Sequence, residues 1–145
     1  MEDKEQMLRK KALSNMVCFM EQCPLHERCL RWQAGAYVPA ERRVATCVSP
    51  RYEGAATEQC DLYCSDEPVH MPLGMRHFFD DMPARIAAGI RRSLINHNCR
   101  TTFYKYQSGR RPITPDYQRL IEAVCRRHGW NGPFNYDGEY VGYVW

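Results

Sequence analysis

The sequence predicts a mainly α fold in one domain, in which a small irregular N-terminal half (1–68) is pinned by a metal site and a helical C-terminal half (69–145) follows. Three observations predict it. Apolar residues recur with a helical period after residue 69. Glycines and prolines interrupt residues 35–68 without a clear period, which indicates irregular backbone. Three cysteines fall within twelve residues near the N-terminus, so a bound metal could hold that backbone in place.

Composition indicates the class of protein and its compartment. The apolar content of 44% is ordinary for one globular domain of 145 residues with its own core. No window approaches about 18 consecutive apolar residues, so no transmembrane helix is expected. The first residues are charged and lack the apolar stretch of a secretory signal. We therefore expect a cytoplasmic protein that does not contact a membrane.

Two helices are expected in the N-terminal half. The first covers residues 4–21, where acids precede bases and apolar residues follow helical spacing. Its apolar stripe consists of Leu13, Met16, Val17 and Met20. The second is a short helix over residues 25–33. In the irregular stretch that follows, one short strand is expected near residues 43–48.

The C-terminal half is predicted to begin with two helical segments. Residues 70–81 place their apolar side chains on one side, namely Leu73, Met75, Phe78 and Phe79. Residues 80–97 form a longer helix, with Asp80 or Asp81 as its N-cap and Pro83 in the first turn. The buried face of this helix consists of Ile86, Ile90 and Leu94.

The clearest helix signal lies in residues 113–129. Thr114 is a good N-cap, Pro115 occupies the first turn, and Asp116 faces the positive end of the helix dipole. The buried stripe consists of Leu120, Ile121, Val124 and Cys125. Gly129 follows a basic last turn and ends the helix.

The segment between these helices, residues 100–112, is compatible with two structures. Its Thr, Phe and Tyr residues suit a β-hairpin that turns at Ser108-Gly109. Alternatively, Thr101 or Thr102 caps a short helix that ends at the same glycine. We favour the helix, which gives the C-terminal half a helix-turn-helix-like outline. The aromatic tail beyond it is expected to pack back on the helices.

The chain contains eight cysteines. Disulfides do not persist in a reducing compartment, where clustered thiols more often bind metal. The cluster Cys18, Cys23 and Cys29 therefore predicts a zinc site, with an iron–sulfur cluster as the alternative. The candidates for the fourth ligand are Cys47, Cys60 and His26. Cys99 and Cys125 are expected to be ordinary buried residues.

A basic block occupies residues 85–128, which carry ten Lys or Arg and two acids. Its net charge of +8 contrasts with +3 for the whole chain. Cations neutralise phosphates and tyrosines stack on unpaired bases, so this block is a candidate surface for DNA or RNA. The candidate residues are Arg91, Arg92, Arg100, Thr101, Thr102, Lys105, Arg110 and Arg111. In the competing interpretation, Phe103 and Tyr104 belong to the core and the arginines are only solvated.

Several stretches carry a resemblance to a known family. They are CFMEQCPLHERCLRW, Cys60 with Tyr63 three residues on, TTFYKYQSGRRPITPDYQ, PFNYDGEY and the final YVW. From about Cys18 to Trp145 the chain resembles a family of short uncharacterised bacterial proteins, a domain of unknown function typical of gut-type Bacteroidota. Before Cys18 the sequence departs from that pattern. The resemblance implies that the shared thiols, and so the metal ligands, are Cys18, Cys23, Cys29 and Cys60. It implies no activity.

Three functions are compatible with these features. The first is a metal-binding protein that binds DNA or RNA through the basic half in a regulatory role. The second is a protein-interaction module with a structural metal, in which the same arginines meet an acidic protein partner. The third is an iron–sulfur redox sensor. No Ser–His–Asp order, phosphate loop or pair of acids indicates catalysis, so an enzyme is not expected.

Overall fold

The computed structural model describes residues 3–145. Across this range the chain is 39% helical and contains five α-helices, one short 3-10 helix and an antiparallel sheet of two strands. The fold is therefore mixed α/β with much irregular backbone, and the predicted mainly α fold with a helix-turn-helix-like half is wrong. No helix among these residues is long and apolar enough to cross a membrane.

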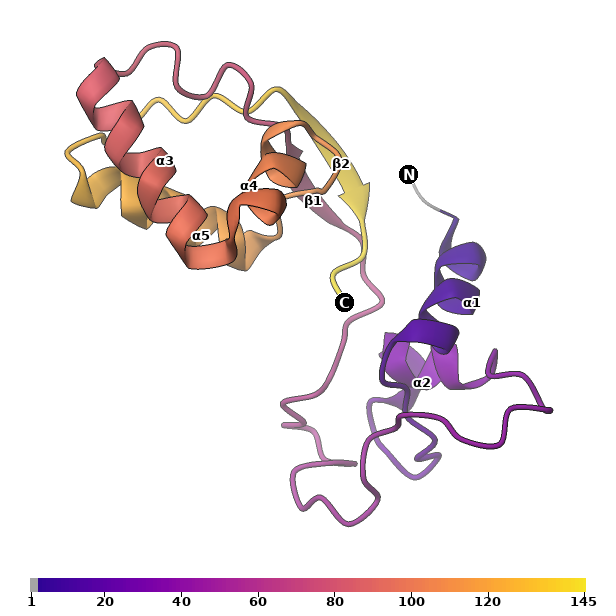
Figure 1. The fold of residues 1–145 in the computed structure, drawn as a ribbon. Coiled ribbons are helices and arrows are strands. Elements are labelled where there is room, and N and C mark those ends of the chain that lie inside the picture. Colours follow the sequence, from indigo (N-terminus) through magenta and orange to yellow (C-terminus); the bar gives the residue numbers. More distant parts are fainter. Residues whose placement is uncertain (1–2) are drawn as a thin grey trace. The chain divides into compact units, whose positions relative to one another are not determined.

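The chain divides into two compact units (Figure 1). Unit 1 comprises Met1–Val69 and Gly142–Trp145, and unit 2 comprises His70–Val141. The helices of unit 1 are α1 (Lys4–Ser14), the 3-10 helix η1 (His26–Arg28) and α2 (Leu30–Gly35). Unit 2 contains nearly all of strands β1 (Val69–Leu73) and β2 (Gly138–Gly142), and the helices α3 (Ala84–Asn98), α4 (Arg100–Gln107) and α5 (Pro115–Arg127).

Helix α1 is shorter than the sequence predicts and buries a different face. Asp3 caps its start by accepting a hydrogen bond from the Glu5 N–H, and the backbone becomes extended at Asn15. Val17 can then form a β-bridge with Cys47 instead of a further helical turn. The face that packs near α2 carries Met7, Leu8 and Ala12, whereas the predicted stripe residue Leu13 is 54% exposed.

Backbone and side-chain hydrogen bonds hold the irregular part of unit 1. Besides the parallel bridge at Val17, an antiparallel bridge joins Cys29 to Ser65. Lys4 Nζ lies 3.0 Å from the carboxylate of Asp66. The strand predicted near residues 43–48 is reduced to the bridge at Cys47, and the contacts described here join segments of the irregular backbone directly.

In unit 2, residues 69–73 form a strand where a helical segment is predicted. β1 pairs with β2, far along the chain, and its central residue Met71 is buried. The Pro72 carbonyl accepts a hydrogen bond of 2.8 Å from the N–H of Ile113. After the strand, Gly74 adopts φ +80°, which a residue with a Cβ rarely takes, and the chain turns away from helical geometry.

Helices α3 and α5 lie close to their predicted positions. α5 has the predicted N-cap Thr114, whose hydroxyl accepts a hydrogen bond of 3.4 Å from the Tyr117 N–H, and Gly129 follows it at φ +87°. α3 starts after Pro83 without a side-chain cap, so the predicted cap is wrong. The two candidate caps have other partners: the Asp80 carboxylate contacts His77 Nδ1 at 2.9 Å, and Asp81 accepts from Asn135 at 3.1 Å.

Residues 100–107 are helical, so the favoured interpretation of this segment is confirmed and the hairpin is not formed. α4 follows α3 after a single residue, Cys99, at φ +104°. The core of unit 2 gathers the apolar sides of its helices, including Ile90, Leu94, Phe103, Ile113, Ile121 and Val124. The aromatic tail packs as predicted, with Phe134 and Tyr136 on this core and Tyr143 and Trp145 on the core of unit 1.

We predict that Ile121→Ala lowers the free energy of unfolding by about 2–5 kcal/mol, because Ile121 is fully buried and its loss leaves a cavity. Ile121→Val should cost only about 0.5–1.5 kcal/mol. The exposed Leu13→Ala should stay within about 0.5 kcal/mol of the parent protein. Urea unfolding followed by circular dichroism measures all three, and equal effects of Ile121→Ala and Leu13→Ala would contradict the assigned core.

Candidate functional site

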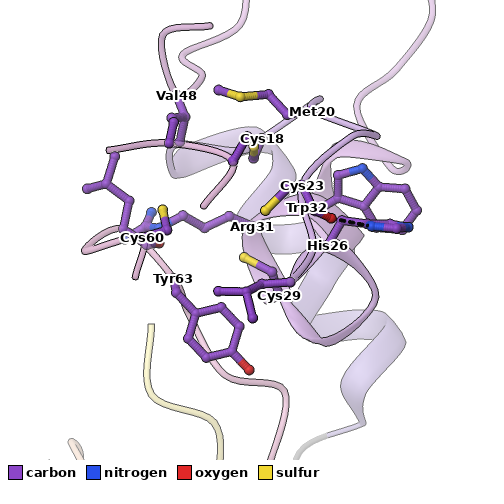
Figure 2. Close-up of a pocket in the computed structure, with 14 residues that line it drawn as sticks. Cys18, Met20, Cys23, His26, Cys29, Arg31, Trp32, Val48, Cys60 and Tyr63 are labelled. Carbon is purple, nitrogen blue, oxygen red and sulfur yellow. Dashed lines mark hydrogen bonds between the residues drawn. The ribbon is translucent and has the colours of Figure 1, made fainter. Parts of the chain in front are cut away.

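The four predicted metal ligands line one cavity in unit 1. Cys18, Cys23, Cys29 and Cys60 all contribute to its wall, together with apolar side chains such as Val48. Its volume is about 20 Å³, counted as space for the centre of a water-sized sphere. That is room for one water molecule or one ion. Figure 2 shows the labelled cysteines around this cavity.

Each cysteine is positioned by a separate backbone interaction. The Cys18 N–H donates to the Arg31 carbonyl at 2.9 Å, beside the bridge formed by Val17. Cys23 and Cys60 each close a tight turn, by donating to carbonyls three residues earlier at 3.3 Å. Cys29 immediately precedes α2 and pairs with Ser65. Segments that are distant in sequence therefore bring their thiols to the same place.

The electrostatics of Cys18 indicate that the four thiols interact. Burial raises the pKa of the Cys18 thiol, and a hydrogen bond from the backbone of Met20 opposes this rise. The charges of Cys29, Cys23 and Cys60 raise the pKa of Cys18 further. Four thiolates in one cavity would repel each other, and a cation between them would remove that repulsion.

The sulfurs share the cavity without being arranged as the ligands of one ion. In residues 3–145, no three His, Cys, Asp or Glu side chains are spaced to hold a metal together. Metal binding would require the sulfurs to approach to about 2.3 Å from a common centre. Rotation about the side-chain torsion of each cysteine is one way in which its sulfur could approach that centre.

The two other candidates for the fourth ligand differ in position. His26 lines the cavity, but its Nδ1 lies 2.6 Å from the Cys23 carbonyl, to which it must donate, and its ring packs edge-on against Trp32. Cys47 is exposed and does not line the cavity. The geometry therefore favours Cys60 over Cys47 as the fourth thiol.

Two further cysteines belong to the interior. Cys64 is buried and donates to the Val144 carbonyl at 3.0 Å, and burial raises the pKa of its thiol. Cys125 is fully buried in the core of unit 2, as predicted, and burial raises its pKa to about 11. Neither lines the four-cysteine cavity.

Cys99 is exposed, so the prediction that it is an ordinary buried residue is wrong. It is the N-cap residue of α4 and has a positive φ of +104°. A hydrogen bond of 3.3 Å joins its sulfur to the Thr102 hydroxyl. This bond lowers the pKa of the Cys99 thiol, and the backbone of Thr102 and Thr101 and the charge of Lys105 act in the same direction.

The predicted nucleic-acid residues are only partly brought together. Thr101, Lys105 and Arg110 line one open groove in unit 2, with a volume of about 410 Å³. The other side chains that line it are Arg76, Tyr104, Gln107 and Ser108. Arg91 lies over the ring of Phe79 and Arg111 over that of Tyr106, outside the groove lining. Thr102 and Arg92 do not line it either.

None of the six predicted cations forms an ion pair with an acid within residues 3–145. They are Arg91, Arg92, Arg100, Lys105, Arg110 and Arg111. By contrast, Arg119 pairs with Asp116 and Arg126 with Glu122. Sequence reasoning missed Arg76, because it lies outside the basic block in a segment predicted to be helical.

We predict that iodoacetamide modifies Cys99 before Cys64 and Cys125, because Cys99 is exposed and its lowered pKa increases the thiolate fraction near neutral pH. Thr102→Val should raise the pKa of the Cys99 thiol. The alkylation rate of Cys99 should then increase over a higher pH range than in the parent protein. Peptide mass mapping after brief exposure measures each site, with exposed Cys47 as the control that Thr102→Val leaves unchanged. Equal rates at Cys99 in both proteins across the pH range would contradict the role of Thr102.

Comparison with known proteins gives the family but no activity. No curated protein and no solved structure matches the chain. One family model, described as a family of unknown function, matches residues 1–145. The resemblance to an uncharacterised family is thereby confirmed, while the bacterial origin of that family stays a prediction. The chain belongs to the family of unknown function DUF6078.

Proposed function

We propose that this protein binds one zinc ion in unit 1 through Cys18, Cys23, Cys29 and Cys60. The observation that carries the proposal is that these four thiols line a single cavity with room for about one ion. Thiolates are preferred ligands of zinc, and four of them complete a closed structural site. Such a site would stabilise the irregular part of unit 1 and would leave no open position for a substrate.

The surroundings of the four thiols suit a charged centre. Four thiolates around a divalent ion carry a net charge of about −2, which is costly in an apolar cavity. The guanidinium of Arg31, which also lines the cavity, is a permanent positive charge that offsets part of it. The backbone N–H of Met20, directed at the Cys18 sulfur, stabilises the thiolate form as well.

The small cavity favours a single ion over an iron–sulfur cluster. A cluster adds several irons and bridging sulfides between the cysteines, whereas the cavity accepts about one water-sized sphere. If the purified protein contained stoichiometric iron and its visible absorbance bleached in air, the zinc proposal would be wrong. The iron–sulfur redox sensor would then be the better account of the site.

We predict that the protein takes up one equivalent of Zn²⁺ or Co²⁺, and that Cys29→Ser and Cys60→Ser each remove tight binding. The reason is that each variant deletes one of four thiolates from the site. Titration with a colorimetric zinc chelator as competitor measures the affinity, and the thiolate-to-cobalt absorption band reports the number of sulfurs bound.

The matched control is Cys47→Ser, which removes an exposed cysteine outside the cavity and should leave both measurements unchanged. Unimpaired binding in Cys60→Ser together with loss in Cys47→Ser would assign the fourth ligand to Cys47. Unimpaired binding in every single variant would contradict the site.

Unit 2 supports a second candidate function, which is binding of DNA or RNA in a cytoplasmic, regulatory role. The specific observation is that six cations of the basic block have no acidic partner in the described structure. Unpaired surface arginines are available to phosphates at little desolvation cost. The alternative is an acidic protein partner that meets the same side chains.

We predict that the double variant Arg110→Glu/Arg111→Glu weakens binding of a labelled DNA duplex and flattens its salt dependence. Each lost phosphate contact should remove about 0.9 from the slope of log affinity against log salt. Fluorescence anisotropy titrations at several salt concentrations measure this. The control is Arg85→Glu/Arg127→Glu, which changes the net charge equally at exposed positions outside the groove. No binding of either duplex or single strands at low salt would favour the acidic protein partner.

A further inference from the structure

The solvent face of α4 forms the floor of the groove in unit 2. Thr101, Tyr104, Lys105 and Ser108 line it, at the spacing that places side chains on one side of a helix. The opposite side of α4 is fixed in the core by Phe103, which is 1% exposed, and by Tyr106. The floor therefore presents its side chains from a rigid element.

Two arginines outside α4 also line the groove. Arg76 is held by Asp137, whose carboxylate accepts hydrogen bonds from the N–H groups of Arg76 at 2.8 Å and His77 at 3.1 Å. The Arg76 guanidinium also donates to the Ser108 carbonyl at 3.4 Å. Arg110 follows Gly109, where φ is +75° and the chain turns back past the end of α4.

The groove combines positive charge with an exposed aromatic ring. Arg76, Lys105 and Arg110 line it, and none of its described lining residues is an acid. Tyr104 is 46% exposed, which is unusual for so large a ring and leaves part of it open to a ligand. The guanidinium of Arg100 lies over this ring, 5.8 Å from its centre, and adds a further cation at one of its faces.

We propose that this groove binds single-stranded nucleic acid, with a base stacked on Tyr104 and the adjoining phosphates on Arg76, Lys105 and Arg110. The inference rests on the proposed nucleic-acid function and narrows it. In a duplex the bases stack on each other, so their faces are not available to a protein side chain. An exposed aromatic ring between cations therefore favours single strands, whose bases can stack on it. The hydroxyl of Thr101 is a further donor to phosphate or sugar oxygens. The volume of about 410 Å³ lies within the usual range for a site that holds one small ligand, such as a single nucleotide unit.

The test uses fluorescein-labelled oligonucleotides of about 12 residues: a thymine strand, the matching duplex, and a strand with the same phosphates but abasic sugars. The full-length protein should bind the thymine strand more tightly than the duplex. Tyr104→Ala should weaken binding of the thymine strand about five- to 150-fold, the range for loss of one stacked base. Tyr104→Phe should retain binding, and Tyr104→Ala should not affect the abasic strand.

The loop arginines should behave differently from the ring. Arg76→Ala and Arg110→Ala should each weaken both the thymine and the abasic strand, and each should lower the salt slope by about 0.7. Arg127→Ala removes the same charge from an exposed position outside the groove and is the matched control. Circular dichroism of each variant verifies that the helical content of the protein is retained.

The outcomes separate this inference from the function on which it rests. Nucleic-acid binding that prefers duplex, or that Tyr104→Ala does not change, would overturn the single-strand groove while the broader function stands. No binding of any strand at low salt would overturn both. Equal losses for the thymine and abasic strands in Tyr104→Ala would show that the ring does not stack on a base, which also overturns the inference.

Discussion

The guanidinium of Arg31 connects parts of unit 1 that no regular sheet joins. Its Nε donates to the Leu62 carbonyl at 2.9 Å and its Nη1 to the Met16 carbonyl at 3.2 Å. Its carbon lies 5.8 Å from the ring centre of Trp145, in the returning C-terminal tail. The same side chain lines the four-cysteine cavity. A partly buried cation that donates to two backbone carbonyls is costly to displace, so Arg31 helps to hold these segments together.

The arrangement around Arg31 also bears on the proposed metal site of unit 1, in which hydrogen bonds already join the backbone segments. The cavity wall is otherwise mostly apolar, as Val48 illustrates, so thiolates there lack solvation by water. A divalent ion would supply the missing positive charge, and Arg31 would balance the excess negative charge that remains. Unit 2 has the opposite electrostatics, because cations and no acids line its groove, which would suit an anionic ligand.

Local signals in the sequence were sufficient for some features and not for others. Helix α5 could be predicted because Thr114, Pro115 and its apolar stripe all specify the same helix. The gathering of Cys60 with the N-terminal cysteines came from a family resemblance, since no periodicity links residues so distant in sequence. The pairing of β1 with β2 was missed because Met71 and its partners across the sheet are joined by long-range contacts that a local pattern cannot encode. Arg76 was missed for the same reason, as the carboxylate that positions it belongs to Asp137.

X-ray absorption at the zinc edge, on protein purified under reducing conditions, tests the four-cysteine centre most directly. The account predicts one zinc ion per chain with four sulfur neighbours at about 2.3 Å. Four sulfur neighbours would show that cysteine thiols alone complete the site, as expected if the four around the cavity close on one ion. Protein without stoichiometric zinc, or a first shell made of nitrogen and oxygen, would contradict it.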